Sequence, residues 1–134
     1  MIIDTSATIA VILFEPEAPR LSQAIVEFLA EGRRPLMSAG TAVECGVVVT
    51  RREADLGRTA LERFLQETNT EIVPVDADQV RLAWAAFEAY GKGRHLAALN
   101  FGECFAYALA RQRGLPLLFK GADFSRTDVA VAAY

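Results

Sequence analysis

The chain has 134 residues, a net charge of −3 and 52% hydrophobic residues. This length fits one compact domain, and the composition excludes an intrinsically disordered chain. The acidic balance excludes a protein that coats nucleic acid through a large basic surface, although a local basic rim can coexist with it.

Strand and helix patterns alternate along the chain. Short apolar runs bounded by turn residues predict strands, and apolar residues at helical spacing predict helices. In chain order, the pattern predicts a strand at 1–3, helices at 6–14 and 18–31, a strand at 36–39, helices at 41–52 and 56–68, a strand at 72–75, a helix after the N-cap Asp76, a loop at 91–100, a helix at 101–113 closed by Gly114, and strands at 116–119 and 129–133. This order predicts one α/β domain over residues 1–134, with a mostly parallel sheet of about five strands covered by helices on both faces.

The sequence predicts neither a membrane span nor a secretion signal. No uncharged stretch reaches the roughly 18–20 apolar residues that cross a bilayer. The apolar N-terminus has no basic region before it and is interrupted by Asp4. Cys45 and Cys104 both lie in apolar segments, where buried free thiols are expected rather than a disulfide. We therefore expect a soluble cytoplasmic protein.

Four carboxylates stand alone in uncharged, apolar surroundings. Asp4 is the only charge in MIIDTSATIAVILF, Glu44 is the only one in PLMSAGTAVECGVVVT, Glu103 is the only formal charge in HLAALNFGECFAYALA, and Asp123 follows LPLLF within KGADF. A buried carboxylate is costly unless it is paired, hydrogen-bonded or bound to metal, and nearby cations are too few to pair all four. Asp4 and Asp123 follow predicted strands, where open α/β sheets bind ligands. The four acids are therefore compatible with one rim of the sheet.

Three of these acids have simple structural explanations as well. Asp4 could cap the helix that follows it, and Asp123 could be a turn residue. Glu44 could hydrogen-bond a neighbouring helix or pair with Arg51.

Glu103 has the strongest structural alternative. With Asn100 it forms the pattern Asn-x-x-Glu, which is typical of a capping box. All four structural explanations would have to hold independently, and none explains why the flanking sequence avoids other charges. A shared divalent-cation site is therefore favoured.

The chemistry of Mg²⁺ and Mn²⁺ fits such a site. Both are hard cations that prefer carboxylate and water oxygens, and a divalent ion removes the repulsion among clustered carboxylates. The hydroxyls of Thr5 and Ser6 could hold a ligand water, although helix capping also suits at least one of them.

Basic residues flank the acids in sequence. Those that could contact phosphates are Lys92, Arg94, Lys120 and Arg126. His95, the only histidine, is either a solvated loop residue or a substrate contact beside Arg94. A Ser–His–Asp triad would need this one histidine, and no nucleophile-elbow sequence accompanies it.

At these residues the sequence resembles the PIN-domain nucleases, and specifically the VapC ribonuclease toxins of bacterial type II toxin–antitoxin systems. The matching segments are IDTSA, TAVECGVV, YGKGRH with LNFGECFAYALA, and LLFKGADFSRTD. By this resemblance, Asp4, Glu44, Glu103 and Asp123 map onto the family's acidic quartet, which binds Mg²⁺ or Mn²⁺. The family usually has Asp where this chain has Glu103, a change that could alter the metal or weaken activity. Ala122 also replaces an often polar residue.

The resemblance implies a three-layer α/β/α PIN-like domain, usually a homodimer, which forms a heterotetramer or larger assembly with a partner antitoxin that obstructs the site. It implies metal-dependent endoribonuclease activity that leaves a 5′-phosphate and a 3′-hydroxyl. Asp4, Glu103 and Asp123 would ligate the metal, and Glu44 would complete or orient the site, with Thr5, Ser6 and Asn100 in support.

Two alternatives remain at this point. One is a catalytically weakened PIN domain retained as an antitoxin-binding protein, an idea that the Glu103 substitution supports. The other is a receiver domain with an acidic pocket. Receivers need a pair of acids after the first strand, whereas Asp4 stands alone, and a phospho-acceptor Asp after the third strand, which here runs through Pro74 into a helix cap.

Overall fold

Four short parallel strands form the centre of the molecule. The computed structural model describes the backbone of residues 1–134 and the side chains of residues 1–52 and 56–134. The strands are β1 (Ile2–Ile3), β2 (Leu36–Ser38), β3 (Glu71–Val73) and β4 (Leu117–Leu118), in the spatial order β3-β2-β1-β4. Ile2 pairs with Leu36 on one side and Leu117 on the other. The chain that leaves β1 at Asp4 therefore starts from the interior of the sheet.

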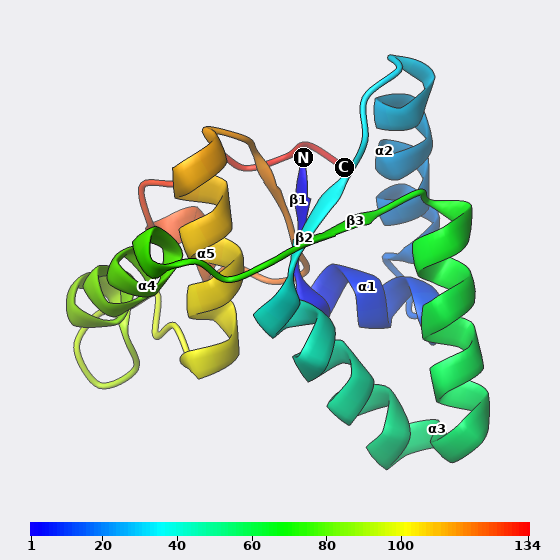
Figure 1. Ribbon diagram of the computed structural model, residues 1–134, viewed down its shortest axis with the longest axis horizontal. Coiled ribbons are helices and arrows are strands. Elements are labelled where there is room, and N and C mark those ends of the chain that lie inside the picture. The colour runs from blue at the N-terminus through cyan, green and yellow to red at the C-terminus, as the bar shows by residue number, and fades with distance from the viewer.

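Helices cover both faces of this sheet. They are α1 (Thr5–Ile12), α2 (Ala18–Ala30), α3 (Ala39–Glu67), α4 (Ala77–Tyr90) and α5 (Phe101–Arg113), with a short 3₁₀ helix, η1 (Phe124–Arg126). Figure 1 shows α1, α2 and α3 on one side of the strands and α4 and α5 on the other. The predicted three-layer α/β/α architecture is confirmed.

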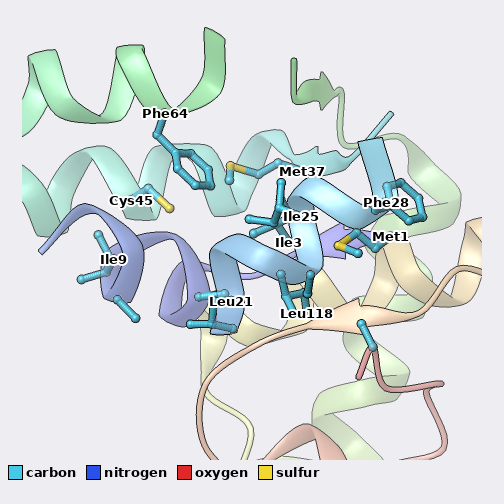
Figure 2. Packing of buried hydrophobic residues seen from close by; sticks show 14 of the residues in the cluster. Met1, Ile3, Ile9, Leu21, Ile25, Phe28, Met37, Cys45, Phe64 and Leu118 are labelled. Carbon is cyan, nitrogen blue, oxygen red and sulfur yellow. The ribbon is translucent and has the colours of Figure 1, made fainter. Parts of the chain in front are cut away.

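Two apolar cores separate the three layers. Successive strand residues point to opposite faces, so Ile3 packs with Leu21, Ile25 and Phe28 on the side of α1–α3, as Figure 2 shows. Ile2 packs into the second core, with α4 and α5. Burial of each such aliphatic side chain contributes roughly 1.5–3 kcal/mol. The two cores fix the helices, and so the side chains at their ends, relative to the sheet.

Helix ends follow the sequence signals closely. Asp76 caps α4, because its Oδ1 accepts a hydrogen bond of 2.8 Å from the backbone N–H of Gln79. The helix at 101–113 has the predicted bounds and ends at Gly114, whose φ of +61° is left-handed.

The predicted helices at 41–52 and 56–68 are joined in a single helix, α3. Figure 1 shows this element leaving the sheet and then returning toward β3. Its two limbs, 39–52 and 56–67, touch where Gly57 meets Val49: a Cβ added at Gly57 would lie only 2.7 Å from the carbonyl oxygen of Val49. Gly57 therefore permits the close approach of the limbs.

The predicted fifth strand contributes a single bridge. Val131 pairs in parallel with Leu117, whose backbone bonds to Ala130 and Ala132 at 2.9 Å each. The pairing is short because β4 itself has only two residues.

Within the described part of the chain, no helix combines the length and the apolar character that a bilayer crossing needs.

Candidate active site

An acidic hollow of about 390 Å³ lies where the chain leaves β1. Its polar and charged lining comes from α1, α3, α5 and the segments after α1 and β4: Asp4, Thr5, Ser6, Glu15, Glu44, Arg52, Asn100, Glu103 and Lys120. Three of the four predicted acids therefore meet in one place, together with all three predicted supporting residues.

Asp4 is buried, and its two carboxylate oxygens have different surroundings. Oδ2 accepts two hydrogen bonds from Ser6, one from the backbone N–H at 2.8 Å and one from the hydroxyl at 2.6 Å. Oδ1 is buried without a hydrogen-bond partner among the described residues. Burial raises the pKa of Asp4 above its ordinary value, the hydrogen bonds from Ser6 oppose this shift, and the charge of Glu44 adds to it.

Glu44 enters the hollow from α3. The hydroxyl of Thr5 donates a hydrogen bond of 2.5 Å to its Oε2, which joins α3 to the start of α1. The alternative partner that the sequence offered, Arg51, forms no ion pair with Glu44 in the described structure, and its side chain is exposed. The orientation of the Glu44 carboxylate is thus set by a neutral hydroxyl.

Glu103 takes part in the capping box and also lies in the hollow. The backbone N–H of Asn100 donates to its Oε2 at 2.7 Å, and the backbone N–H of Glu103 donates to Oδ1 of Asn100 at 3.0 Å. Partial burial raises the pKa of Glu103 to about 7; the bond from Asn100 opposes the shift, while the charges of Asp4, Asp123 and Glu44 add to it. Glu103 can therefore cap α5 and belong to the acidic site at the same time.

Asp123 lies beyond β4, at the start of η1. Its side chain is exposed and makes no capping hydrogen bond to that helix. It is absent from the lining of the hollow, but its charge is close enough to raise the pKa of Glu103. Asp123 therefore belongs to the rim of the acidic region.

Asp4, Glu44 and Glu103 line the hollow together. Among the described residues, no three His, Cys, Asp or Glu side chains are gathered tightly enough to hold one ion as they lie. The donor set nevertheless fits a hard divalent cation, because it consists of carboxylate and hydroxyl oxygens. The unpartnered Oδ1 of Asp4 supplies the buried polar atom that such a cation would satisfy.

Lys120, a predicted phosphate contact, is engaged in ion pairs. Its Nζ lies 2.7 Å from Glu15 and 2.9 Å from Glu17, and Arg52 lies 3.6 Å from Glu15. Sequence reasoning missed Glu15, Glu17 and Arg52. The sequence holds no spacing signal that connects Glu15 or Glu17 with Lys120, which lies more than a hundred positions away.

The other predicted phosphate contacts, and the predicted substrate contact His95, are not among the residues that line the hollow. His95 packs edge-on against Tyr90, with ring centroids 5.3 Å apart. Arg126 donates a hydrogen bond of 2.8 Å to the carbonyl oxygen of Leu96, and Arg94 lines an apolar groove between α4 and α5. Lys92 is exposed in the same loop. These residues shape the 91–100 loop and its surroundings.

Comparison with known proteins identifies the relatives of this chain. Residues 1–130 match the family model described as PIN domain. Ribonuclease VapC30 of Mycobacterium tuberculosis is 44% identical over 133 residues, which cover 99% of this chain and 98% of that protein. Ribonuclease VapC of Mycolicibacterium smegmatis is 44% identical over 130 residues, covering 97% and 98%.

Solved structures share the fold. The crystal structure of Mycobacterium tuberculosis VapC20, a sarcin–ricin loop cleaving toxin, has a TM-score of 0.74 at 17% identity and covers 96% of this chain and 95% of that one. Rickettsia felis VapBC2 bound to a DNA fragment from its promoter also has a TM-score of 0.74 at 17% identity, covering 97% and 94%. With the family match and the close relatives, these comparisons lead to one conclusion: the chain belongs to the VapC ribonucleases of the PIN domain family.

Proposed function

We propose that this protein is an endoribonuclease that acts as the toxin of a type II toxin–antitoxin pair and hydrolyses RNA phosphodiester bonds with the help of a divalent cation. The observation that carries the proposal is the carboxylate of Asp4, which has one buried, unpartnered oxygen beside Glu44 and Glu103 in a single hollow. The relatives named as ribonucleases support the same reaction class.

Asp4, Glu103 and Asp123 would ligate the cation, which we propose to be Mg²⁺ or Mn²⁺ because all their donor atoms are carboxylate oxygens. Glu44 would complete the site or orient it. When bound, such a cation would lower the pKa of a coordinated water and offset negative charge on the phosphoryl oxygens.

The chain's own residues prepare this chemistry. Ser6 fixes Asp4 so that its Oδ1 remains available, and Thr5 fixes Glu44. Asn100 holds Oε2 of Glu103 and leaves its other oxygen without a hydrogen bond among the described residues. In-line attack by water leaves a 5′-phosphate and a 3′-hydroxyl.

The decisive experiment is an RNA cleavage assay on the purified chain with Mg²⁺, with Mn²⁺ and with EDTA, followed by analysis of the new RNA ends. We expect cleavage only with a divalent cation, 5′-phosphate products, and no cleavage by Asp4→Asn. Cleavage that persists in EDTA, or that survives Asp4→Asn, would overturn the proposal.

One observation favours a second candidate, a catalytically weakened domain that mainly binds antitoxin. The capping box engages Oε2 of Glu103, at the position where the family usually has Asp. If the wild type fails to cleave RNA with either cation and Glu103→Asp cleaves it, the weakened domain is correct. The family assignment rules out the receiver alternative.

An antitoxin is the proposed protein partner, in keeping with similar folds solved as toxin–antitoxin complexes. A groove of about 540 Å³ between the limbs of α3 exposes the apolar side chains of Val43 and Val47. Val48, on the same helix, lines the acidic hollow. A segment seated in this groove would therefore lie beside the hollow and could obstruct it.

We also propose a homodimer that uses the α4–α5 face. A groove of about 780 Å³ there is lined by aromatic side chains, and Trp84 and Phe101 are 67% and 78% exposed. Exposed apolar patches of this kind mark interaction sites. Glu88 and Arg94 border the groove, and neither forms an ion pair among the described residues. Opposite charges on one patch suit a two-fold interface, in which Glu88 of one protomer faces Arg94 of its partner and the reverse.

A further inference from the structure

We propose that Gly102 is a positioning residue whose missing side chain provides the space for the carboxylate of Glu44. A Cβ added at Gly102 would lie 2.5 Å from Oε2 of Glu44 and closer still to Oε1 and Cδ. Real Cβ contacts are essentially never shorter than 3.0 Å. Glycine at 102 and glutamate at 44 are thus a matched pair across α3 and α5.

Backbone conformation does not require glycine at this position. Gly102 is the second residue of α5, and it is not among the residues with positive φ. Glycine is a poorer helix former than alanine, so local helix stability would favour alanine there. The requirement for glycine therefore comes from the neighbouring carboxylate.

The consequence of a larger residue falls on the site and spares the fold. The atoms that would collide are the end of a flexible side chain, so Glu44 could rotate away at little cost to folding. On its other side, however, Glu44 accepts the hydrogen bond of 2.5 Å from Thr5. A displaced carboxylate would lose that bond and its place beside Asp4.

Gly102 also directly precedes Glu103. In the first turn of α5, the backbone of Gly102 therefore lies against the carboxylate of Glu44, and the next residue, Glu103, carries a carboxylate itself. A single turn of helix in this way sets the separation between two of the acids. This inference rests on the proposed function only for the expected effects on metal binding and RNA cleavage.

The test compares Gly102→Ala, Glu44→Asp and the double variant. Aspartate is one methylene shorter, so its carboxylate leaves room for the new Cβ. We expect Gly102→Ala to melt, in EDTA, within a few degrees of the wild type and to bind Mn²⁺ about tenfold more weakly or worse. Adding Glu44→Asp to it should restore part of that affinity, although Glu44→Asp alone weakens it. Gly46→Ala, on α3 with no atoms near its added Cβ, should leave Mn²⁺ affinity unchanged.

Unchanged Mn²⁺ affinity in Gly102→Ala, or a double variant in which the two losses simply add, would overturn the inference. A metal-free crystal structure of Gly102→Ala tests it separately from the proposed function. We expect the Glu44 carboxylate to leave hydrogen-bonding distance of the Thr5 hydroxyl. A carboxylate that stays in place would refute the positioning role even if the enzyme is active. A wild type that neither binds Mn²⁺ nor cleaves RNA would instead refute the proposed function alone.

Discussion

Ser6 gives both of its hydrogen bonds to the same oxygen of Asp4. The backbone N–H and the hydroxyl of Ser6 reach Oδ2 at 2.8 Å and 2.6 Å, while Oδ1 is buried with no partner among the described residues. One carboxylate thus caps α1 with one oxygen and leaves the other without a partner, and we propose that this second oxygen ligates the cation.

Asp4→Asn should separate these two roles. An amide oxygen can still accept from Ser6, so helix capping persists, and loss of a buried charge leaves the melting temperature in EDTA unchanged or higher. RNA cleavage should fall by more than the roughly 10–100-fold typical of residues that only support metal ligands. Asp76→Asn is the matched control, because Asp76 caps α4 outside the hollow. Equal cleavage by the wild type and Asp4→Asn would contradict the ligand role.

Metal binding should stabilise the fold by mass action. At a free Mn²⁺ concentration of about 100 times Kd, the free energy of unfolding should rise by about 2.7 kcal/mol, which a thermal melt detects as a shift of several degrees. Asp4→Asn should lose most of this shift and Asp76→Asn should keep it. The same shift in Asp4→Asn and wild type would mean that the cation binds elsewhere.

The raised pKa of Glu103 predicts how stability depends on pH in the absence of metal. Its pKa is about 7 in the folded state and 4.5 ordinarily, so between these values the folded state binds more protons than the unfolded state. The contribution of Glu103 to the free energy of unfolding is therefore fully present below pH 4.5, and it is lost as the pH rises through about 7. Glu103→Gln keeps an acceptor for Asn100 and removes this dependence.

Melting curves in EDTA from about pH 5 to about pH 8 check this sign. The melting temperature of Glu103→Gln minus that of the wild type should increase with pH. A difference that stays constant over the range, or decreases, would contradict a raised pKa. With Mn²⁺ present the wild type should behave oppositely, since cations bind the deprotonated carboxylates.

The α4–α5 face predicts a defined effect on assembly. Trp84 is 67% exposed, so Trp84→Asp removes little core packing, but it would place a charge in the apolar groove. We expect a shift from dimer to monomer in sedimentation velocity, with an unchanged circular dichroism spectrum. Val26→Asp, at an apolar position on α2 that is 62% exposed, should remain dimeric. A monomeric wild type, or a dimeric Trp84→Asp, would contradict this interface.

The elements that could be predicted from sequence are those with local causes. Asp76 and Gly114 mark the start of α4 and the end of α5 because capping involves only nearby backbone groups. Asp4 could be placed at the rim because it follows a predicted strand, and parallel strands end on one edge of the sheet. Glu44 and Glu103 were grouped with it because they too stand alone in uncharged surroundings. Their isolation from other charges was visible without any knowledge of the fold.

Features that depend on distant contacts could not be predicted. The ion pairs of Lys120 with Glu15 and Glu17 join residues more than a hundred positions apart, and no spacing rule connects them. The contact between the limbs of α3 depends on Gly57 meeting Val49 in three dimensions. For Glu103, capping and site membership looked like rival explanations, although two oxygens allow both.

The four acids reach the hollow and its rim from segments that are far apart in the chain, the first at position 4 and the last at position 123. The segment after β4 is fixed to the start of α1 by a hydrogen bond of 3.0 Å from the backbone N–H of Lys120 to the hydroxyl of Ser6. An emerging chain on the ribosome therefore carries Asp4 long before it carries the strand that brings Asp123 alongside. If Asp123 ligates the cation as proposed, nuclease activity should begin only once β4 has docked and the last of the four acids is in place.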